Sequence, residues 1–314
     1  MKKKLVAGAV TLLSVVTLAA CANGTNKDIV TMKGDTITVS DFYNEIKTNQ
    51  GAQQVLFQMT INKVFEKEYG SKVSDKEVDK ELAKQKKQLG NQFDAYLAQQ
   101  GLTEETAKKQ IRSNMLLEYA VNQAAKKDIK ESDYKAAFES YTPEVTAQII
   151  KLDSEDKAKE VLEAAKAEGA DFAQIAKDNS TDTATKDKGG EVKFDSGTAD
   201  IPSQVKEAAF KLDENGISDV ITVSAGQNYS ASYYIVKLNK KTEKGSDWKK
   251  YEKRLKEIIV DGRKQDTNYI RSIIAKAMTN ANIKVKDDAF KSTFNQYLQN
   301  IGVQTSDSRS SSKK

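Results

Sequence analysis

Residue types that usually carry out chemistry in proteins are scarce in this sequence, which has 314 residues, no histidine and a single cysteine, Cys21. The lack of imidazole excludes Ser-His-Asp and Cys-His nucleophile systems and acid–base catalysis by histidine. A single cysteine cannot form an intramolecular disulfide, and with carboxylates alone it would make an atypical zinc site. We therefore expect neither a metal site nor a cofactor.

Cys21 stands at the end of a leader, in which residues 1–4 form a basic start and residues 5–20 an apolar run that ends in small side chains. This pattern predicts a secretory signal peptide over residues 1–20, because the run is too short and wrongly flanked for a stable membrane span. Leu18-Ala-Ala-Cys21 matches the bacterial lipobox, in which the cysteine thiol receives a diacylglyceryl group and becomes the new N-terminus. An ordinary signal peptide with an incidental cysteine is the alternative.

Lipid attachment at Cys21 would anchor the chain without a membrane span, since two acyl chains give stable attachment. Residues 21–28 are largely polar and predict a tether that holds the folded part away from the bilayer. We therefore expect a lipid-anchored protein on the extracellular face of the cell membrane.

The charge balance gives no argument for a nucleic-acid partner or a polybasic membrane patch. Charged residues make up 30% of the chain and aromatic residues 7%, and the formal net charge is +5. Three of these positive charges are lysines of the leader, so removal of the leader would leave about +2. A chain of this length can form two or so domains with a sizeable core.

The segment 29–142 predicts a short hairpin followed by several amphipathic helices. Residues 29–32 and 36–39 flank Lys33-Gly-Asp35, and Ser40 or Asp41 is expected to cap the first helix. Ser74-Asp-Lys-Glu77 is a capping-box pattern, and a further helix is expected to start at Thr103. The apolar positions at helical spacing are Phe42, Tyr43, Ile46, Val55, Leu56, Met59, Val64, Phe65, Val78, Leu82, Leu89, Ala107, Ile111, Met115 and Tyr119.

These apolar stripes have two interpretations. They are either ordinary core, or parts of a groove for non-native chains formed together with a C-terminal helix. Adaptable methionines favour promiscuous surfaces, and the candidates are Met59, Met115 and Met278. Near the C-terminus, Asp247 is expected to cap one long helix from residue 248 to about 280, and the polar tail from Ser306 is expected to be disordered.

The segment 143–241 predicts one compact α+β domain. A strand over 145–152 is followed by a helical run, a glycine pair at Gly189-Gly190, and a closing strand over 233–237. These phrases, in this order, resemble the parvulin family of peptidyl-prolyl isomerases, and the whole chain is similar to PrsA-type foldases. The resemblance implies a parvulin-like domain, a small antiparallel sheet with helices, inserted into a mostly helical chaperone domain. The helical domain would comprise residues 29–142 and 242–300, followed by a disordered tail over 301–314.

The resemblance also assigns site residues. The two facing histidines of the family fall on Gln148 and Tyr234, and its Cys or Asp falls on Asp182. The proline pocket would comprise Val192 in place of leucine, Phe194, Ile201 in place of methionine, Val205 in place of phenylalanine, and Phe210. Each has a structural interpretation too: the phenylalanines as core, Asp182 as a turn residue, and Tyr234 as a half-buried strand tyrosine.

Proline isomerisation requires a catalyst that holds the proline ring and stabilises a twisted amide over the planar one. Gln148 and Tyr234 can form hydrogen bonds, but Val205 is small and would grip the ring less well. We therefore expect weak or lost isomerase activity, although a modest rate from orientation and apolar burial stays open.

The sequence thus predicts an extracytoplasmic, membrane-anchored foldase that binds unfolded or partly folded secreted polypeptides after translocation, and a homodimer stays open. A fully active isomerase that uses Gln148, Asp182 and Tyr234 is the first alternative. A solute-binding lipoprotein or adhesin is the second, but long helical runs argue against the two α/β lobes expected of a solute-binding protein.

Overall fold

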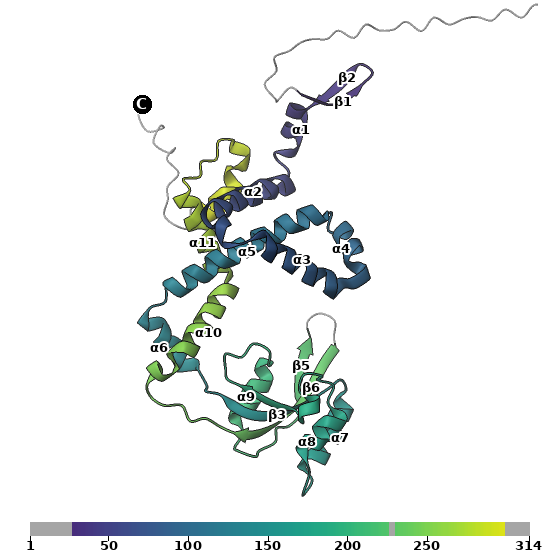
Figure 1. Ribbon diagram of the computed structural model, residues 1–314, viewed down its shortest axis with the longest axis vertical. Coiled ribbons are helices and arrows are strands. Elements are labelled where there is room, and N and C mark those ends of the chain that lie inside the picture. The colour runs from purple at the N-terminus through teal and green to yellow at the C-terminus, as the bar shows by residue number, and fades with distance from the viewer. Residues whose placement is uncertain (1–26, 226–229, 299–314) are drawn as a thin grey trace, which may run out of the picture. The chain divides into compact units, whose positions relative to one another are not determined.

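The computed structural model describes residues 27–225 and 230–298, and these are mostly helical with two small antiparallel sheets (Figure 1). The chain forms two compact units, one from the residues up to Gly70 together with those from Ile274, the other from Ser71–Ile273. Cys21, the leader and the tail from residue 299 lie outside the described residues.

The first unit begins with the predicted hairpin. Its strands are β1 (Asp28–Met32) and β2 (Asp35–Thr38), which pair antiparallel around Gly34 at φ 88°. Helix α1 (Val39–Ile46) is capped by Thr38, so the predicted caps Ser40 and Asp41 are wrong. Asp41 is instead the third helical residue, and its carboxylate accepts the Thr38 N–H at 2.9 Å. The cap lies earlier because Thr38 and Asp41 together satisfy two free amides of the first turn.

The other helices of the first unit are α2 (Gln50–Tyr69), the end of α11 (Thr267–Asn280) and α12 (Lys291–Leu298). The inner side of α2 consists of Phe57, Ile61, Val64 and Phe65. Phe57 packs edge-on against Phe294 with ring centroids 5.4 Å apart. Val55 and Met59, which the sequence places near the same face, are 59% and 51% exposed, so the interpretation of these two residues as core is wrong.

The second unit contains the helices α3 (Asp75–Leu89), α4 (Phe93–Gln99), α5 (Glu104–Lys127), α6 (Glu131–Ser140) and α10 (Glu252–Gln265). The predicted capping box of Ser74 and Glu77 is confirmed, and Thr103 caps α5. On α5, Leu116 and Ala120 are buried to 1% exposure, whereas the predicted Met115 and Tyr119 are only half-buried.

The predicted single C-terminal helix is wrong. Asp247 does cap the start, but only of a short turn, Trp248–Tyr251, that leads into α10. Helix α10 runs through Gly262 and stops at Asp266, whose ψ is 107°. The Asp266 carboxylate accepts the Asn268 N–H at 2.8 Å and so starts α11. An aspartate side chain that caps a new first turn competes with continuation of the old helix.

The larger sheet has the strand order β4-β3-β6-β5, all antiparallel. Its strands are β3 (Val145–Leu152), β4 (Glu191–Phe194), β5 (Ile221–Ala225) and β6 (Ser230–Lys240). Its helices are α7 (Glu155–Lys166), α8 (Phe172–Asn179) and α9 (Ser203–Lys211). In chain order this α+β part lies between α6 and α10, so it is inserted between helical segments as predicted.

The two faces of this sheet bury separate cores. Ile150, Leu152 and Ile235 pack with α7 and α8 on one face. Ala147, Ile149 and the neighbouring Val236 pack with α9 on the other. Alternation along each strand therefore decides which core a side chain joins.

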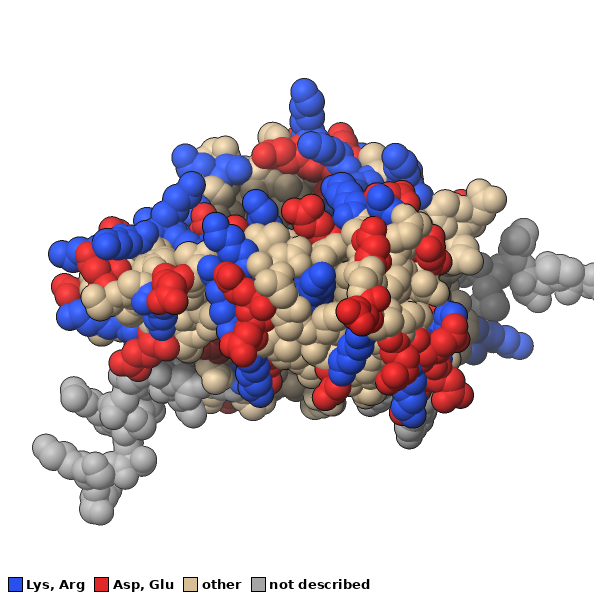
Figure 2. Space-filling model, turned by 90° about the horizontal axis from the view of Figure 1, so that it is seen from below, with Lys and Arg blue, Asp and Glu red and all other residues tan. Residues whose placement is uncertain are grey.

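Acidic and basic side chains are interspersed on the face shown in Figure 2. Among the described residues, no helix is both long and apolar enough to cross a membrane.

Candidate functional site

The positions assigned to the two family histidines do not meet. In the register of β3 and β6, Gln148 lies opposite Lys237, whereas Tyr234 lies opposite Lys151. This offset of three residues corresponds to about 10 Å along the strands. Gln148 alternates with Ile149, so it points to the α7 and α8 face, whereas Tyr234 belongs to the core on the α9 face. The expected facing pair is therefore not formed.

Gln148 has a structural role next to the glycine pair. Its Nε2 donates to the Gly189 carbonyl at 2.9 Å, and the Ile149 N–H donates to the Gly190 carbonyl at 2.8 Å. Both glycines have positive φ, 67° and 78°, and a Cβ on Gly190 would collide with the Ile149 backbone. The sequence needs glycine here because the backbone turns left-handed while it touches β3.

Tyr234 is the assigned residue with a free functional group. It is 9% exposed, and its hydroxyl forms no hydrogen bond with a described residue. Burial raises the pKa of Tyr234, and the nearby charges of Asp182 and Asp153 raise it further. The phenol therefore stays protonated at neutral pH and can donate a hydrogen bond.

Asp182 is engaged in its own turn. One carboxylate oxygen accepts the Ala184 N–H at 3.1 Å, and the other accepts the Thr185 hydroxyl at 2.6 Å. Its backbone N–H donates to the Ser180 hydroxyl at 3.2 Å. Both oxygens are thus occupied by local hydrogen bonds, which is the turn role that its sequence context favours.

The five residues assigned to the proline pocket do gather in one place, the core on the α9 face. Phe194 and Val205 are buried to 1% and 0% exposure, and the Phe194 and Phe210 rings lie 5.8 Å apart. Val192, Ile201 and Phe210 are half-buried at the edge of this core. Only the latter three can offer surface to a proline ring, because Phe194 and Val205 are enclosed.

The first unit contains an open apolar groove of about 750 Å³. Val55 and Met59 of α2 lie exposed in it, opposite the segment 282–287 and α12. Of the three methionines considered as adaptable contacts, Met59 lines the groove, while Met278 is fully buried. The remaining apolar lining consists of Tyr43, Ile46, Ala52, Leu56, Ile283, Val285, Phe290 and Phe294.

The hairpin of the same unit adds more exposed apolar surface. Every residue of β1 is exposed, and Ile29, Met32 and Ile37 are 50%, 51% and 40% exposed. A two-stranded hairpin alone is marginally stable in water. Large exposed apolar patches usually mark binding surfaces.

Comparison with known proteins identifies the family. Residues 141–240 match the family profile described as "Rotamase: PPIC-type PPIASE domain". Foldase protein PrsA of Streptococcus sanguinis is 62% identical over 302 residues, which cover 96% of this chain and 90% of the relative. Foldase protein PrsA of Streptococcus gordonii is 60% identical over 315 residues, the whole of both chains. The chain belongs to the PrsA foldase family.

Solved PrsA structures share the fold. The crystal structure of foldase protein PrsA from Streptococcus pneumoniae aligns with a TM-score of 0.78 and 55% identity, over 86% of this chain and 99% of that one. The PrsA structure from Lactococcus lactis aligns with a TM-score of 0.65 and 39% sequence identity, over 87% of this chain and 99% of that one. A foldase role and a parvulin domain set between helical segments, both predicted from the sequence, are thus confirmed.

A partly buried ion pair joins the parvulin domain to α10, and no sequence pattern indicated it. Arg254 donates to both oxygens of Asp195, with Nε at 2.6 Å and Nη2 at 2.8 Å. Thr198 and Tyr141 hydroxyls donate to the same carboxylate at 3.0 and 3.1 Å. Burial alone would raise the pKa of Asp195, but Arg254 and the hydroxyl hydrogen bonds hold it below its ordinary value.

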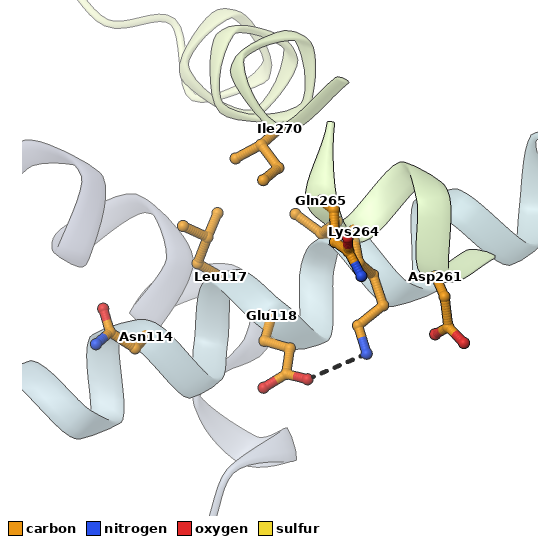
Figure 3. A pocket seen from close by; sticks show the side chains of 8 residues that line it. Asn114, Leu117, Glu118, Asp261, Lys264, Gln265 and Ile270 are labelled. Carbon is orange, nitrogen blue, oxygen red and sulfur yellow. Dashed lines mark ion pairs between the residues drawn. The ribbon is translucent and has the colours of Figure 1, made fainter. Parts of the chain in front are cut away.

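A second hollow, of about 400 Å³, lies in the larger unit beside α5 and α10 (Figure 3). Leu117 and Ile270 supply apolar side chains, and Lys264 forms an ion pair with Glu118 at 3.4 Å. These two charges largely neutralise each other, which leaves Asp261 as the remaining charge of the lining.

Proposed function

We propose that this member of the PrsA foldase family is anchored to the extracellular face of the cell membrane through Cys21 and assists the folding of secreted polypeptides after translocation. The anchoring rests on the leader and the lipobox of the sequence. The chaperone activity rests on one observation, the open apolar groove of the first unit, lined by exposed Val55 and Met59. Unfolded chains expose apolar side chains that such a surface can cover.

The parvulin domain contributes binding or orientation more than catalysis in this proposal. Gln148 supports the glycine turn and Asp182 supports its own turn. Phe194 and Val205 are enclosed, so the ring-binding surface is reduced to the half-buried residues. Few groups are left to stabilise a twisted amide over a planar one.

The domain limits follow the same proposal. The middle domain spans residues 143–241, close to the matched range 141–240. Residues 29–142 and 242–300 form the chaperone segments, and 301–314 the tail.

Suppression of aggregation tests the chaperone activity. The chain from residue 22 on keeps every described residue and is mixed in severalfold excess with a denatured client. We expect light scattering to fall strongly, and to recover with Val55→Gln/Met59→Gln. The matched control is Tyr96→Gln, another exposed aromatic or apolar side chain (43%) in the other unit, which should suppress aggregation like the parent. Equal light scattering by the client with and without the parent chain would contradict the proposed chaperone activity.

An active isomerase is the second candidate, favoured by the Tyr234 hydroxyl, which has no hydrogen-bond partner among the described residues. A refolding reaction limited by proline isomerisation, which takes tens to hundreds of seconds uncatalysed, separates the two. We expect catalytic amounts of the chain to leave this rate nearly unchanged. Strong acceleration that is lost in Tyr234→Phe would instead establish the active enzyme.

A further inference from the structure

Positive charges outnumber negative ones at the rim of the apolar groove. In the segment 282–287, half-buried Ile283 and Val285 alternate with exposed Lys284 and Lys286, and all four belong to the groove lining. Neither lysine forms an ion pair with a described residue. Two ammonium groups without an ion-pair partner among the described residues therefore border an apolar floor.

The lining also contains one carboxylate, Asp287, which stays ionised and offsets only part of this positive charge. Asp287 accepts the Tyr43 O–H at 2.7 Å and the Ala289 N–H at 2.9 Å. These hydrogen bonds lower the pKa of Asp287, with help from the charge of Lys47. Lys47 itself lies 5.8 Å from the centre of the Tyr43 ring and adds a third positive charge near the groove.

We propose that the groove selects unfolded polypeptide segments in which apolar residues are flanked by acidic ones. The apolar floor stabilises the complex by burial, and the lysines at its rim attract carboxylates and repel basic flanks. This inference rests on the proposed chaperone function and adds the class of segment that is bound.

The ends of this chain outside the described residues have the wrong charge for the groove. Residues 299–314 contain Arg309, Lys313 and Lys314 against the single acid Asp307. The leader contains three lysines and no acid. Charge complementarity therefore favours a separate acidic segment over either end of the same chain.

Three fluorescent peptides of equal length test the inference by anisotropy against the chain from residue 22 on. They share a Leu-Val-Phe-Leu centre and differ in flanks of glutamate, glutamine or lysine. We expect the glutamate peptide to bind about fivefold tighter than the glutamine peptide at low ionic strength, and the lysine peptide to bind weakest. At about 0.5 M salt the three affinities should converge, because the rim charges are exposed.

Three double variants locate the effect. Lys284→Gln/Lys286→Gln should bring the glutamate peptide to the affinity of the glutamine peptide, which itself should not change. Lys76→Gln/Lys80→Gln removes two exposed lysines from α3 and should leave the order of the three peptides intact. Val55→Gln/Met59→Gln should weaken all three peptides together.

The outcomes separate this inference from the proposed function. Suppressed aggregation with equal affinity for all flanks would overturn the charge selection and leave the chaperone function standing. An unchanged preference in Lys284→Gln/Lys286→Gln would also overturn it. So would a groove closed by a second copy, seen as a dimer in light scattering that the Val55→Gln/Met59→Gln variant dissociates and that binds no peptide.

Discussion

The parvulin domain and the unit built from the two ends of the chain distribute their apolar side chains in opposite ways. In the parvulin domain, Phe194, Val205 and Ile235 are enclosed on the two faces of a complete sheet. In the terminal unit, Val55 and Met59 are more than half exposed in an open groove. An enclosed core stabilises the fold, whereas an open apolar surface gains free energy only when something else covers it.

The polar groups show the same difference. In the parvulin domain, Gln148, Asp182 and Asp195 all have partners within the protein. At the groove, Lys284 and Lys286 have no ion-pair partner among the described residues. Most polar groups named in the parvulin domain thus have hydrogen-bond or ion-pair partners within the protein. The lysines of the groove in the terminal unit do not have ion-pair partners among the described residues.

The largest expected effect tests the enclosed core against the open groove. Phe194→Ala should lower the free energy of unfolding by about 3–5 kcal/mol, the usual cost of such a cavity. Met59→Ala should change it by less than about 0.5 kcal/mol, because an exposed side chain leaves no cavity. Urea unfolding followed by far-UV circular dichroism measures both variants, and the fluorescence of Trp248, the single tryptophan, isolates the effect in the second unit. Similar losses in both variants would contradict the comparison.

The next effect concerns the junction between the parvulin domain and α10. Arg254→Met removes the partner of the Asp195 carboxylate, which is only 8% exposed. We expect a loss of about 2 kcal/mol, below the full value for a buried pair because the arginine side chain is one-third exposed. Arg271→Met, an exposed arginine of α11, is the control and should stay within about 0.5 kcal/mol of the parent.

The pH dependence of this junction has a definite sign. The pKa of Asp195 is lowered in the folded state, so the stabilisation is complete above the unfolded pKa and is lost as the pH falls through the folded one. The difference in unfolding free energy between parent and Arg254→Met should therefore be largest near neutral pH. It should shrink as the pH falls below the ordinary value of 3.8. A difference that grew in acid would refute the assignment.

Local chemistry explains which elements the sequence could predict. The capping box of Ser74 and Glu77 and the hairpin at Gly34 depend on neighbouring residues only. The end of α10 at Asp266 was missed because the apolar stripe continues past it, although an aspartate before Thr-Asn is a recognisable cap.

The geometry of the candidate site depends on contacts between residues that are far apart in the chain, and the sequence predicts such contacts less well. Family phrases located the residues around Phe194 and Phe210 that gather in one core. The separation of Gln148 from Tyr234 depends on the register of β3 and β6, which no local pattern fixes. Arg254 and Asp195 are 59 positions apart, and the alternation of Ile283 to Lys286 would have been the one available signal for the groove rim.

The smallest expected change in stability is at Tyr234, and it tests whether the parvulin domain binds clients as the groove is proposed to do. Because its hydroxyl forms no hydrogen bond with a described residue, Tyr234→Phe should change the free energy of unfolding by less than about 0.5 kcal/mol. Gln148→Leu, on the other face of the sheet, removes the bond to Gly189 and should cost about 1 kcal/mol. If Tyr234→Phe leaves the stability unchanged but weakens the binding of proline-containing peptides, the hydroxyl has a binding role. If Tyr234→Phe changes neither stability nor peptide affinity, the parvulin sheet acts as scaffold, and client binding belongs to the groove.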